Sequence, residues 1–473
     1  MANVNGNSNF DNYIDSLKEG ISSQNTSLTV IESILDAARV SKCEINKLGR
    51  SYYIKNGDKP SVLLHLNIDN SSELSYEFLD IDGEESVRSN SHMNLLAASI
   101  VINYFLRFSK KSFDILITNS NIQTKLEDFE EIKSLLRSNN IINLNLRQSD
   151  CIADEFSSLL LSLITVPVNR FKADYDFKTY RLSISNLMGG HSGDNINKVR
   201  MNSIKMIIGI FRRMKSKVDI DMLSLFAGDK YDNIPSFSDL EFIINSNYEN
   251  ELLNAFEIYK NEAIEKNLRY EPDMKLLCEE IENTDTDPIT NETFNHLASF
   301  IELSPTGDFA VNSLDDQVIS SSNLATARTL KDNINLIIVF RSLTEEGMSQ
   351  MLEKSRIAAK IANSDLIEKL FIPSLKIKDK KLTDTFISSY KDLYDKDLEV
   401  IRTQYSLDSS IVFKNQNVKM VSLGVKYKQD KEYYYTQVED ILSVINLLDC
   451  VMGKLENDKE NLWQKHLIFT VMK

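Results

Sequence analysis

Apolar and polar positions follow two different periods in the first third of the chain. Short apolar runs suit buried strands, and they occupy residues 61–68, 113–118 and 141–146. Apolar residues recur at helical spacing in the segments between and before them, at residues 28–40, 95–108 and 127–137. Helices that alternate with strands act as crossovers, so this order predicts parallel pairing and an α/β sheet covered on both faces.

The middle of the chain, residues 178–378, mixes strands and helices without strict alternation. Predicted strands lie at 180–187, within 218–248, at 308–313 and at 333–341. Predicted amphipathic helices lie at 202–217, 250–265 and 344–363. This order is typical of a separate α+β domain. Residues 376–381 are highly charged, and we predict that they form a solvated link at the end of this domain.

The last part of the chain returns to the pattern of the first. Residues 409–413 and 419–423 are predicted strands, and residues 436–455 are a predicted amphipathic helix. A tail of this length is short for an independent domain, so we expect it to complete the first sheet. The prediction is an α/β domain of residues 1–177 and 379–473, interrupted by an inserted α+β domain of residues 178–378.

Composition and charge narrow the classes of partner. Lys and Arg total 54 while Asp and Glu total 69, which gives a net charge of −15. Phosphate would be repelled, so neither nucleic acid nor an anionic membrane is an expected partner. The longest apolar stretch, residues 159–168, is too short to cross a bilayer, and residues 1–9 lack the features of a secretion signal. These observations predict a cytoplasmic protein.

Histidines and cysteines limit the metal chemistry. The chain has four cysteines and no Cys-x-x-Cys pair, so zinc knuckles are excluded. It has five histidines, and none of them lies between His296 and His466.

The clearest motif is Ile-Ser-Asn-Leu-Met-Gly-Gly-His-Ser-Gly-Asp-Asn at residues 184–195. A strand that runs into Gly-Gly-His-Ser-Gly resembles the M20 metallopeptidase family, and the following residues resemble its aminoacyl-histidine dipeptidase branch. Further segments resemble that branch in the same order: 63–67, Asp82 with Gly83, 142–145, 319–324, Arg341 with Ser342, and 420–423.

The resemblance implies a zinc-peptidase-like α/β catalytic domain with an inserted α+β lid and dimerisation domain. It implies two zinc ions held by histidines and carboxylates, a metal-bound hydroxide that attacks the peptide carbonyl, and a glutamate that acts as the base. It also implies a homodimer formed through the lid domain, and a lid histidine that stabilises the oxyanion.

This sequence departs from that ligand set at almost every position. His65 matches the first ligand histidine, but amide or apolar side chains stand where the resemblance implies carboxylates or a second histidine. The degenerate positions are Asn67, His92 or its neighbours, Asn121, Ile122, Asn145 and Gln404. A neutral amide is a weak zinc ligand and hydrocarbon is none. We therefore predict no metal, no cofactor and no catalytic residue, with a zinc enzyme as the alternative.

Three residues implied for the lid are retained, namely His191, Asn323 and Arg341. They resemble the groups that, in the family, bind the terminal carboxylate and the oxyanion of the substrate. A guanidinium suits this role because it can bind a carboxylate through two hydrogen bonds. The alternatives are structural. The Gly-Gly-His-Ser-Gly segment would then be a turn that the fold needs, Asn323 and Arg341 would belong to an internal polar network, and His65 would be a hydrogen-bonded histidine at a strand end.

Three functions follow from these alternatives. The first is a catalytically degenerate, non-hydrolytic dimeric scaffold. The second is a protein that still binds small peptides in the lid without cleaving them. The third is an active metallo-dipeptidase, hydrolysing X-His or other dipeptides with an unusual set of metal ligands.

Overall fold

The computed structural model describes residues 4–21, 30–68, 76–89, 93–119, 126–146, 150–407, 409–414, 416–430 and 433–471. The chain forms two compact units. The first comprises residues 1–155, 375–402 and 407–473, and the second comprises residues 156–374 and 403–406. Both units contain helices and a large sheet, which confirms a mixed α/β fold.

The first unit is built on a sheet of nine described strands in the order β1-β2-β6-β3-β7-β22-β8-β20, with β21 paired to β8. Their bounds are β1 (Glu44–Leu48), β2 (Ser51–Asn56), β3 (Val62–Ile68), β6 (Phe113–Asn119), β7 (Asn140–Asn143), β8 (Cys151–Phe156), β20 (Leu375–Lys376), β21 (Glu399–Thr403) and β22 (Lys419–Ser422). β6, β3, β7 and β22 are neighbours and run parallel. The C-terminal strand β22 thus lies inside the sheet that the first part of the chain forms.

Helices and a small second sheet complete this unit. The helices are α1 (Val4–Ile21), α2 (Val30–Val40), α3 (Met93–Phe108), α4 (Leu126–Leu135), α9 (Lys381–Tyr394), α10 (Ser410–Phe413) and α11 (Val438–Val471). The small sheet has the order β23-β24-β5-β4, formed by β4 (Tyr76–Ile81), β5 (Glu84–Ser89), β23 (Lys428–Asp430) and β24 (Tyr433–Gln437).

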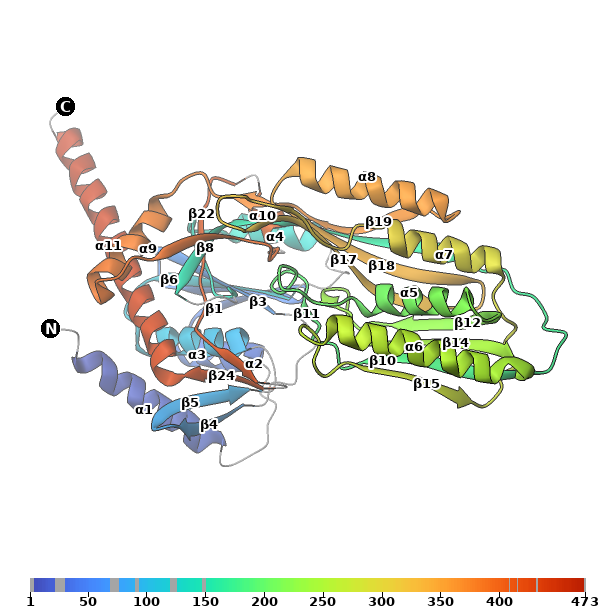
Figure 1. Ribbon diagram of the computed structural model, residues 1–473. Helices are drawn as coiled ribbons and strands as arrows, with labels where there is room; N and C mark the ends of the chain where they lie inside the picture. The colour runs from blue at the N-terminus through green and yellow to red at the C-terminus, as the bar shows by residue number, and fades with distance from the viewer. Residues whose placement is uncertain are drawn as a thin grey trace. The chain divides into compact units, whose positions relative to one another are not determined.

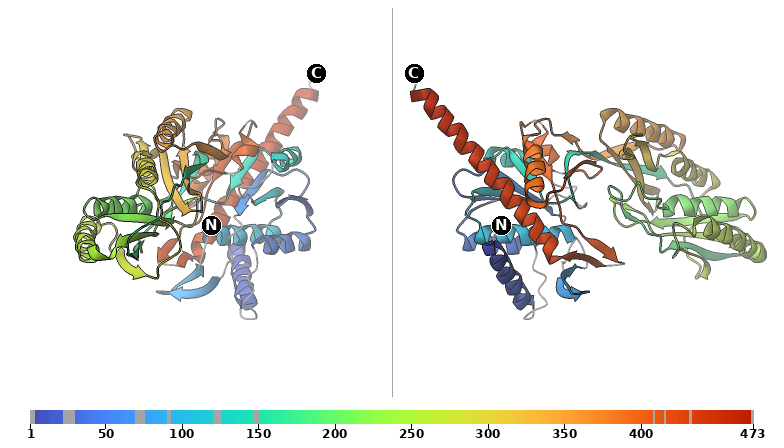
Figure 2. Two further views of the ribbon diagram at one scale, coloured as in Figure 1. Left: turned by 90° about the vertical axis from the view of Figure 1, so that its right-hand side faces the viewer. Right: turned by 60° about the vertical axis from the view of Figure 1, so that its left-hand side comes forward.

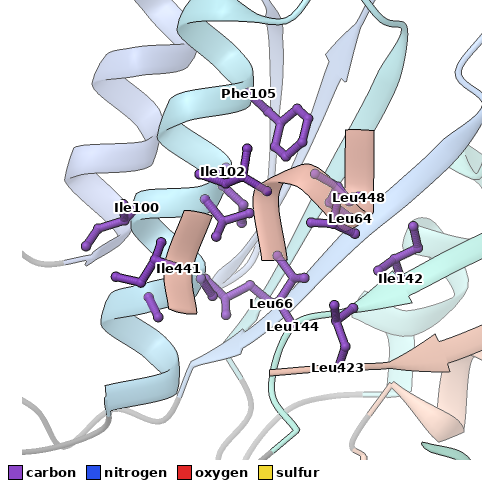
Figure 3. Packing of buried hydrophobic residues seen from close by; sticks show 14 of the residues in the cluster. Leu64, Leu66, Ile100, Ile102, Phe105, Ile142, Leu144, Leu423, Ile441 and Leu448 are labelled. Carbon is purple, nitrogen blue, oxygen red and sulfur yellow. The ribbon is translucent and has the colours of Figure 1, made fainter. Parts of the chain in front are cut away.

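The core of the first unit lies between the large sheet and its helices. α3 is apolar around most of its circumference and is buried along nearly its whole length, as expected of a helix without a polar face. Figure 3 shows how side chains from the strands meet those from α3 and α11. The labelled residues are Leu64, Leu66, Ile142, Leu144 and Leu423 from the sheet side, and Ile100, Ile102, Phe105, Ile441 and Leu448 from the helices.

The predicted strand at residues 409–413 is wrong. Residues Ser410–Phe413 form the one-turn helix α10, in which the amides of Phe413 and Lys414 donate to the carbonyls of Ser409 and Ser410. A short apolar run does not distinguish a strand from a buried turn of helix, and here packing of Val412 and Phe413 decided the outcome.

The second unit has its own sheet of nine described strands, in the order β15-β10-β14-β12-β17-β18-β9-β19, with β16 paired to β17. The bounds are β9 (Ser158–Pro167), β10 (Phe177–Ser185), β12 (Ile220–Ala227), β14 (Ser238–Asn245), β15 (Lys275–Ile281), β16 (Gly307–Val311), β17 (Val318–Thr329), β18 (Asn333–Ser342) and β19 (Leu366–Ile372). Every described pairing in it is antiparallel. Two short strands, β11 (Gly190–His191) and β13 (Asn233–Ile234), pair separately.

Four helices lie side by side along this sheet, as Figures 1 and 2 show. They are α5 (Ser203–Lys215), α6 (Glu249–Asn267), α7 (Asn291–Leu303) and α8 (Glu345–Ile361), and a 3-10 turn, η1 (Ser246–Tyr248), precedes α6. Asn202 begins α5 by accepting hydrogen bonds from the amides of Ile204 and Lys205, which is the usual role of asparagine at a helix start.

The first boundary between the units lies earlier than the predicted one. The sequence predicts a boundary after residue 177, whereas the second unit begins at Phe156. The reason is the pairing of β9, which hydrogen-bonds to β18 on one side and to β19 on the other. The longest apolar stretch therefore forms an interior strand of the second sheet, next to its edge strand β19. No helix in the described part of the chain combines the length and hydropathy needed to cross a membrane.

Candidate functional site

The carboxyl ends of four parallel strands bring polar side chains together in the first unit. In the register, His65 on β3 lies opposite Asn143 on β7, and Asn143 lies opposite Ser422 on β22. Asn67, two residues after His65, lies opposite Thr118 on β6. Residues in register, or two apart along a strand, share one face of a sheet. These five side chains therefore form one cluster.

Backbone groups fix the direction of the hydrogen bonds in this cluster. Oδ1 of Asn143 accepts from the backbone amide of Asn145 at 3.1 Å and from the hydroxyl of Ser422 at 2.5 Å. The other end of the same side chain, Nδ2, must then donate to Nδ1 of His65, at 2.9 Å. Since Nδ1 of His65 is an acceptor, its proton lies on Nε2.

The chain of hydrogen bonds continues from the other ring nitrogen. Nε2 of His65 donates to Oγ1 of Thr118 at 3.0 Å, and Thr118 donates to Oδ1 of Asn67 at 3.1 Å. Asn145 closes the network. Its Oδ1 accepts from the backbone amide of Asn67 at 2.7 Å, and its Nδ2 donates to the carbonyl of Asn67 at 2.8 Å.

Burial keeps His65 neutral. The residue is 0% exposed, and desolvation lowers the pKa of its ring from 6.5 to about 3. The rings of His65 and Phe413 pack in a T-shaped arrangement, with centroids 6.3 Å apart. Both nitrogens of a neutral ring are occupied in this way, so His65 has no free lone pair for a metal.

The donor set at these strand ends does not fit a zinc pair. Zinc in proteins takes thiolate, imidazole or carboxylate ligands, whereas the polar side chains of this cluster, in the part of the chain that the structure describes, are carboxamides and hydroxyls. Across the described residues, no cluster of three or more His, Cys, Asp and Glu side chains could hold a metal ion. His92, Asn121 and Ile122, which the resemblance also places at the metal site, lie outside the described residues.

Gln404, the remaining degenerate position, belongs to the second unit. Its Nε2 donates to the carbonyls of Val318 and Ile319, at 2.8 and 3.1 Å, at the start of β17. Its Oε1 accepts from the hydroxyl of Ser321 at 3.2 Å. The side chain therefore fastens residues 403–406 to β17.

Arg341 lies on β18, opposite Ser321 of β17, and contacts Gln404. It is only 3% exposed, and its Nη1 donates to the carbonyl of Gln404 at 3.3 Å and to Oγ of Ser406 at 3.2 Å. Burial lowers the pKa of this guanidinium, and the negative charges of Asp232 and Asp194 oppose that shift. Its Nε is buried and has no hydrogen-bond partner within the described part of the chain.

Asn323 lies on the same face of β17 as Ser321 and is 1% exposed. Its Nδ2 donates to the carbonyl of Asn233 at 2.7 Å, and Asn233 pairs with His191 between β13 and β11. Its Oδ1 is buried and, within the described ranges, accepts no hydrogen bond. Arg341 and Asn323 therefore present a buried donor and a buried acceptor that have no hydrogen-bond partner among the described residues.

His191 lies between two carboxylates. Its Nδ1 is 3.1 Å from Oδ2 of Asp194, and its Nε2 is 3.9 Å from Oδ2 of Asp232. The backbone amide of Gly193 also approaches Nδ1, at 3.1 Å. The ring lies against Tyr405, with centroids 5.8 Å apart, and the side chain is 10% exposed.

The structure thus gathers the predicted residues into two groups. His65, Asn67 and Asn145 meet in the first unit, and His191, Asn323, Arg341 and Gln404 are connected in the second through Asn233 and residues 404–406. Sequence reasoning missed the residues that complete each group, namely Thr118, Asn143, Ser422, Asp194, Asp232 and Tyr405. Asn143 could have been found, because it lies two residues before Asn145 and so shares its face of the sheet.

Comparisons with known proteins place this geometry in context. No protein-family model matches the chain. The cytosol non-specific dipeptidase of Escherichia coli K12 is 24% identical over 195 residues, and the match spans 40% of this chain and 39% of that protein. The structure of aminoacylhistidine dipeptidase from Vibrio alginolyticus superimposes with a TM-score of 0.65 and 15% identity, covering 90% of this chain and 92% of that one. Human carnosine dipeptidase 1 gives a TM-score of 0.48 with 8% identity, over 95% and 99% of the two chains.

Proposed function

Since this chain has the fold of the M20 peptidases, as its motifs indicated, we propose that it is a catalytically degenerate homologue of an aminoacyl-histidine dipeptidase. It acts as a non-hydrolytic protein that serves as a scaffold or binds peptides. It uses no cofactor.

The observation that carries this proposal is the hydrogen-bond network around His65. Hydrolysis by a metal-bound hydroxide needs ligands that hold the metal and a base that receives the proton. At these strand ends, the one retained histidine donates and accepts hydrogen bonds with Thr118 and Asn143. Among the described residues, the side chains that hydrogen-bond around His65 are neutral amides and hydroxyls, which supply neither strong ligands nor a base at neutral pH.

Binding of small peptides in the second unit is a second candidate, favoured by Arg341 and Asn323. The buried guanidinium of Arg341 and the buried side chain of Asn323 share one face of neighbouring strands, and within the described residues Nε of the first and Oδ1 of the second have no partner, which supplies both a donor and an acceptor. A peptide carboxylate and a peptide amide would satisfy these two groups, and satisfying buried polar groups stabilises a complex.

The oligomeric state and location are part of the same proposal. We expect a cytoplasmic homodimer that forms through the lid domain, the second unit, with no nucleic-acid or membrane partner. β19 is the last strand of that unit's sheet and exposes Ile367 and Phe371, which suits a protein contact. The cytosolic location in the name of the Escherichia coli relative supports the location.

The alternative is an active metallo-dipeptidase that hydrolyses X-His or other dipeptides with zinc and an unusual ligand set. The dipeptidase names of the similar proteins support it. The ligands would then have to come from outside the described cluster at the strand ends.

Metal content separates the two proposals. Protein purified without chelator and offered micromolar zinc or manganese is analysed by mass spectrometry, together with a His65→Gln variant. We expect well below one metal per chain in both proteins, and no hydrolysis of X-His dipeptides. About two metals per chain together with dipeptide hydrolysis would overturn the proposal that the protein is a catalytically degenerate homologue.

Peptide binding and dimerisation have their own tests. Millimolar dipeptides should raise the melting temperature of the unmodified protein but not that of Arg341→Gln, because a ligand that binds only the native state stabilises it. No shift across a broad dipeptide panel would remove the peptide-binding candidate. Light scattering at micromolar concentration should give the mass of two chains, and a monomeric mass would refute the dimer.

A further inference from the structure

A buried carboxylate fastens both ends of the segment that carries His191. Glu271 lies in the turn between α6 and β15 and is 1% exposed. Its Oε2 accepts from the backbone amide of Met188 at 2.6 Å, and its Oε1 accepts from the backbone amide of Met201 at 2.9 Å. Met188 precedes the Gly-Gly-His-Ser-Gly motif and Met201 follows it by several residues.

No described lysine or arginine forms an ion pair with Glu271, and the two hydrogen bonds that its carboxylate accepts from described residues both come from backbone amides. Burying a carboxylate costs free energy unless hydrogen bonds satisfy it. A glutamine would avoid that cost but would have only one acceptor oxygen, and its amide group would then face a backbone N–H. The use of two acceptors explains why a carboxylate occupies this position.

The backbone of the segment between Met188 and Met201 is also constrained at other points. Gly189 and Gly190 adopt left-handed backbone angles, with φ of 53° and 111°. A Cβ on Gly190 would lie 2.4 Å from Oδ1 of Asn195, so the backbone folds tightly on itself at this point. The amide of Ser192 donates to the carbonyl of Asp232 at 2.7 Å. The segment is therefore fastened to β13 on one side and to Glu271 at its two ends.

We propose that Glu271 is a positioning residue, which holds the segment 188–201 so that the His191 ring lies between Asp194 and Asp232. Glu271 does not touch the ring. It acts through the amides of Met188 and Met201, which set where the segment leaves and rejoins the rest of the second unit. This inference deepens the peptide-binding candidate of the proposed function and rests on it, because His191 pairs with Asn233, whose carbonyl accepts a hydrogen bond from Asn323.

The test follows the ring of His191 by NMR in protein labelled with ¹³C at histidine Cε1. Five histidines give few signals, and His191→Gln assigns the signal of interest. In Glu271→Gln we expect the His191 signal to move by more than its linewidth while the other histidine signals stay in place. Glu262→Gln is the matched control, because Glu262 lies on α6 and pairs with Arg213 at the surface. An unchanged His191 signal, or a general shift of all signals, would overturn the proposal.

A second measurement needs no variant. Amide exchange in the unmodified protein should be slowed at Met188 and Met201 by roughly tenfold or more relative to an unprotected amide, because each donates to a buried acceptor. Exchange of both amides at the unprotected rate would overturn the proposal even if Glu271→Gln did not fold. Neither readout depends on metal, hydrolysis, peptide binding or dimerisation, so this inference and the proposed function can fail separately.

Discussion

The side-chain amide of Asn143 donates a hydrogen bond of 2.9 Å to Nδ1 of His65, across the pairing of β7 and β3. This contact determines the chemistry of the strand ends, because it uses the lone pair that a metal would need. It also joins the histidine to Asn145 and Ser422, both of which bond to Oδ1 of the same asparagine. A site built in this way supports the fold by neutral hydrogen bonds between four parallel strands.

The buried state of His65 predicts a dependence of stability on pH. Its pKa is 6.5 in the unfolded chain and about 3 in the folded protein, so below pH 6.5 the unfolded chain binds a proton that the folded one does not. The folded pKa is depressed, and the contribution is therefore complete above pH 6.5 and is lost as the pH falls towards 3. The loss approaches about 1.4 kcal/mol per pH unit.

Urea unfolding between pH 7 and pH 4 measures this slope. His65→Gln is expected to be less stable at pH 7 but to lose stability less steeply with acid. His296→Gln, a partly exposed histidine on α7, is the control and should keep the steeper slope. Equal slopes in the unmodified protein and in His65→Gln would contradict the prediction.

Asn143→Ala should destabilise the first unit by about 3 kcal/mol or more, because it leaves His65, Ser422 and the amide of Asn145 without their buried partner. Asn250→Ala, at an exposed position of α6, should change the free energy of unfolding by less than about 0.5 kcal/mol. The measurement is the urea midpoint at pH 7. A cost for Asn143→Ala no larger than that of the control would show that the network contributes nothing to stability.

Asp114 and Arg137 form another strong polar contact of the first unit. Asp114 is 0% exposed, accepts from Nε and Nη2 of Arg137 at 2.9 and 2.5 Å, and accepts from the hydroxyl of Tyr53 at 2.7 Å. Arg137→Gln leaves this carboxylate buried without its cation, which should cost about 3–5 kcal/mol. Arg39→Gln breaks an exposed pair with Asp36 and should leave the urea midpoint almost unchanged, so similar effects in both variants would refute the prediction.

Gly424 follows β22 at a close approach of two backbones. A Cβ added there would lie 1.8 Å from the carbonyl oxygen of Leu146, which cannot move without disturbing the end of β7. Gly424→Ala should therefore lower the melting temperature strongly. Gly209→Ala, in α5 with no atom within 4 Å of the added Cβ, should raise it, since alanine favours a helix over glycine by about 1 kcal/mol. A tolerated Gly424→Ala would contradict the close packing of these strand ends.

Much of this architecture was predictable from local patterns. The runs at 61–68, 113–118 and 419–423 became β3, β6 and β22, because a buried parallel strand is apolar on both faces. Parallel order then places the ends of the strands together, and His65, Asn67 and Asn145 lie in one hydrogen-bonded cluster there. The Gly-Gly-His-Ser-Gly motif marked a tight turn, because left-handed backbone angles favour glycine.

Other features depended on contacts that no local pattern contains. β9 joined the second unit because β18 and β19, far along the chain, pair with it. Gln404 belongs beside Arg341 because its amide finds the carbonyls of β17, and the role of Asn143 depends on the register between β7 and β3. The sequence by itself determined which side chains stand at strand ends and which donors are missing there. Only the tertiary structure decided which partner each polar group has, because hydrogen bonds between distant segments depend on register and burial, and neither is a property of one segment alone.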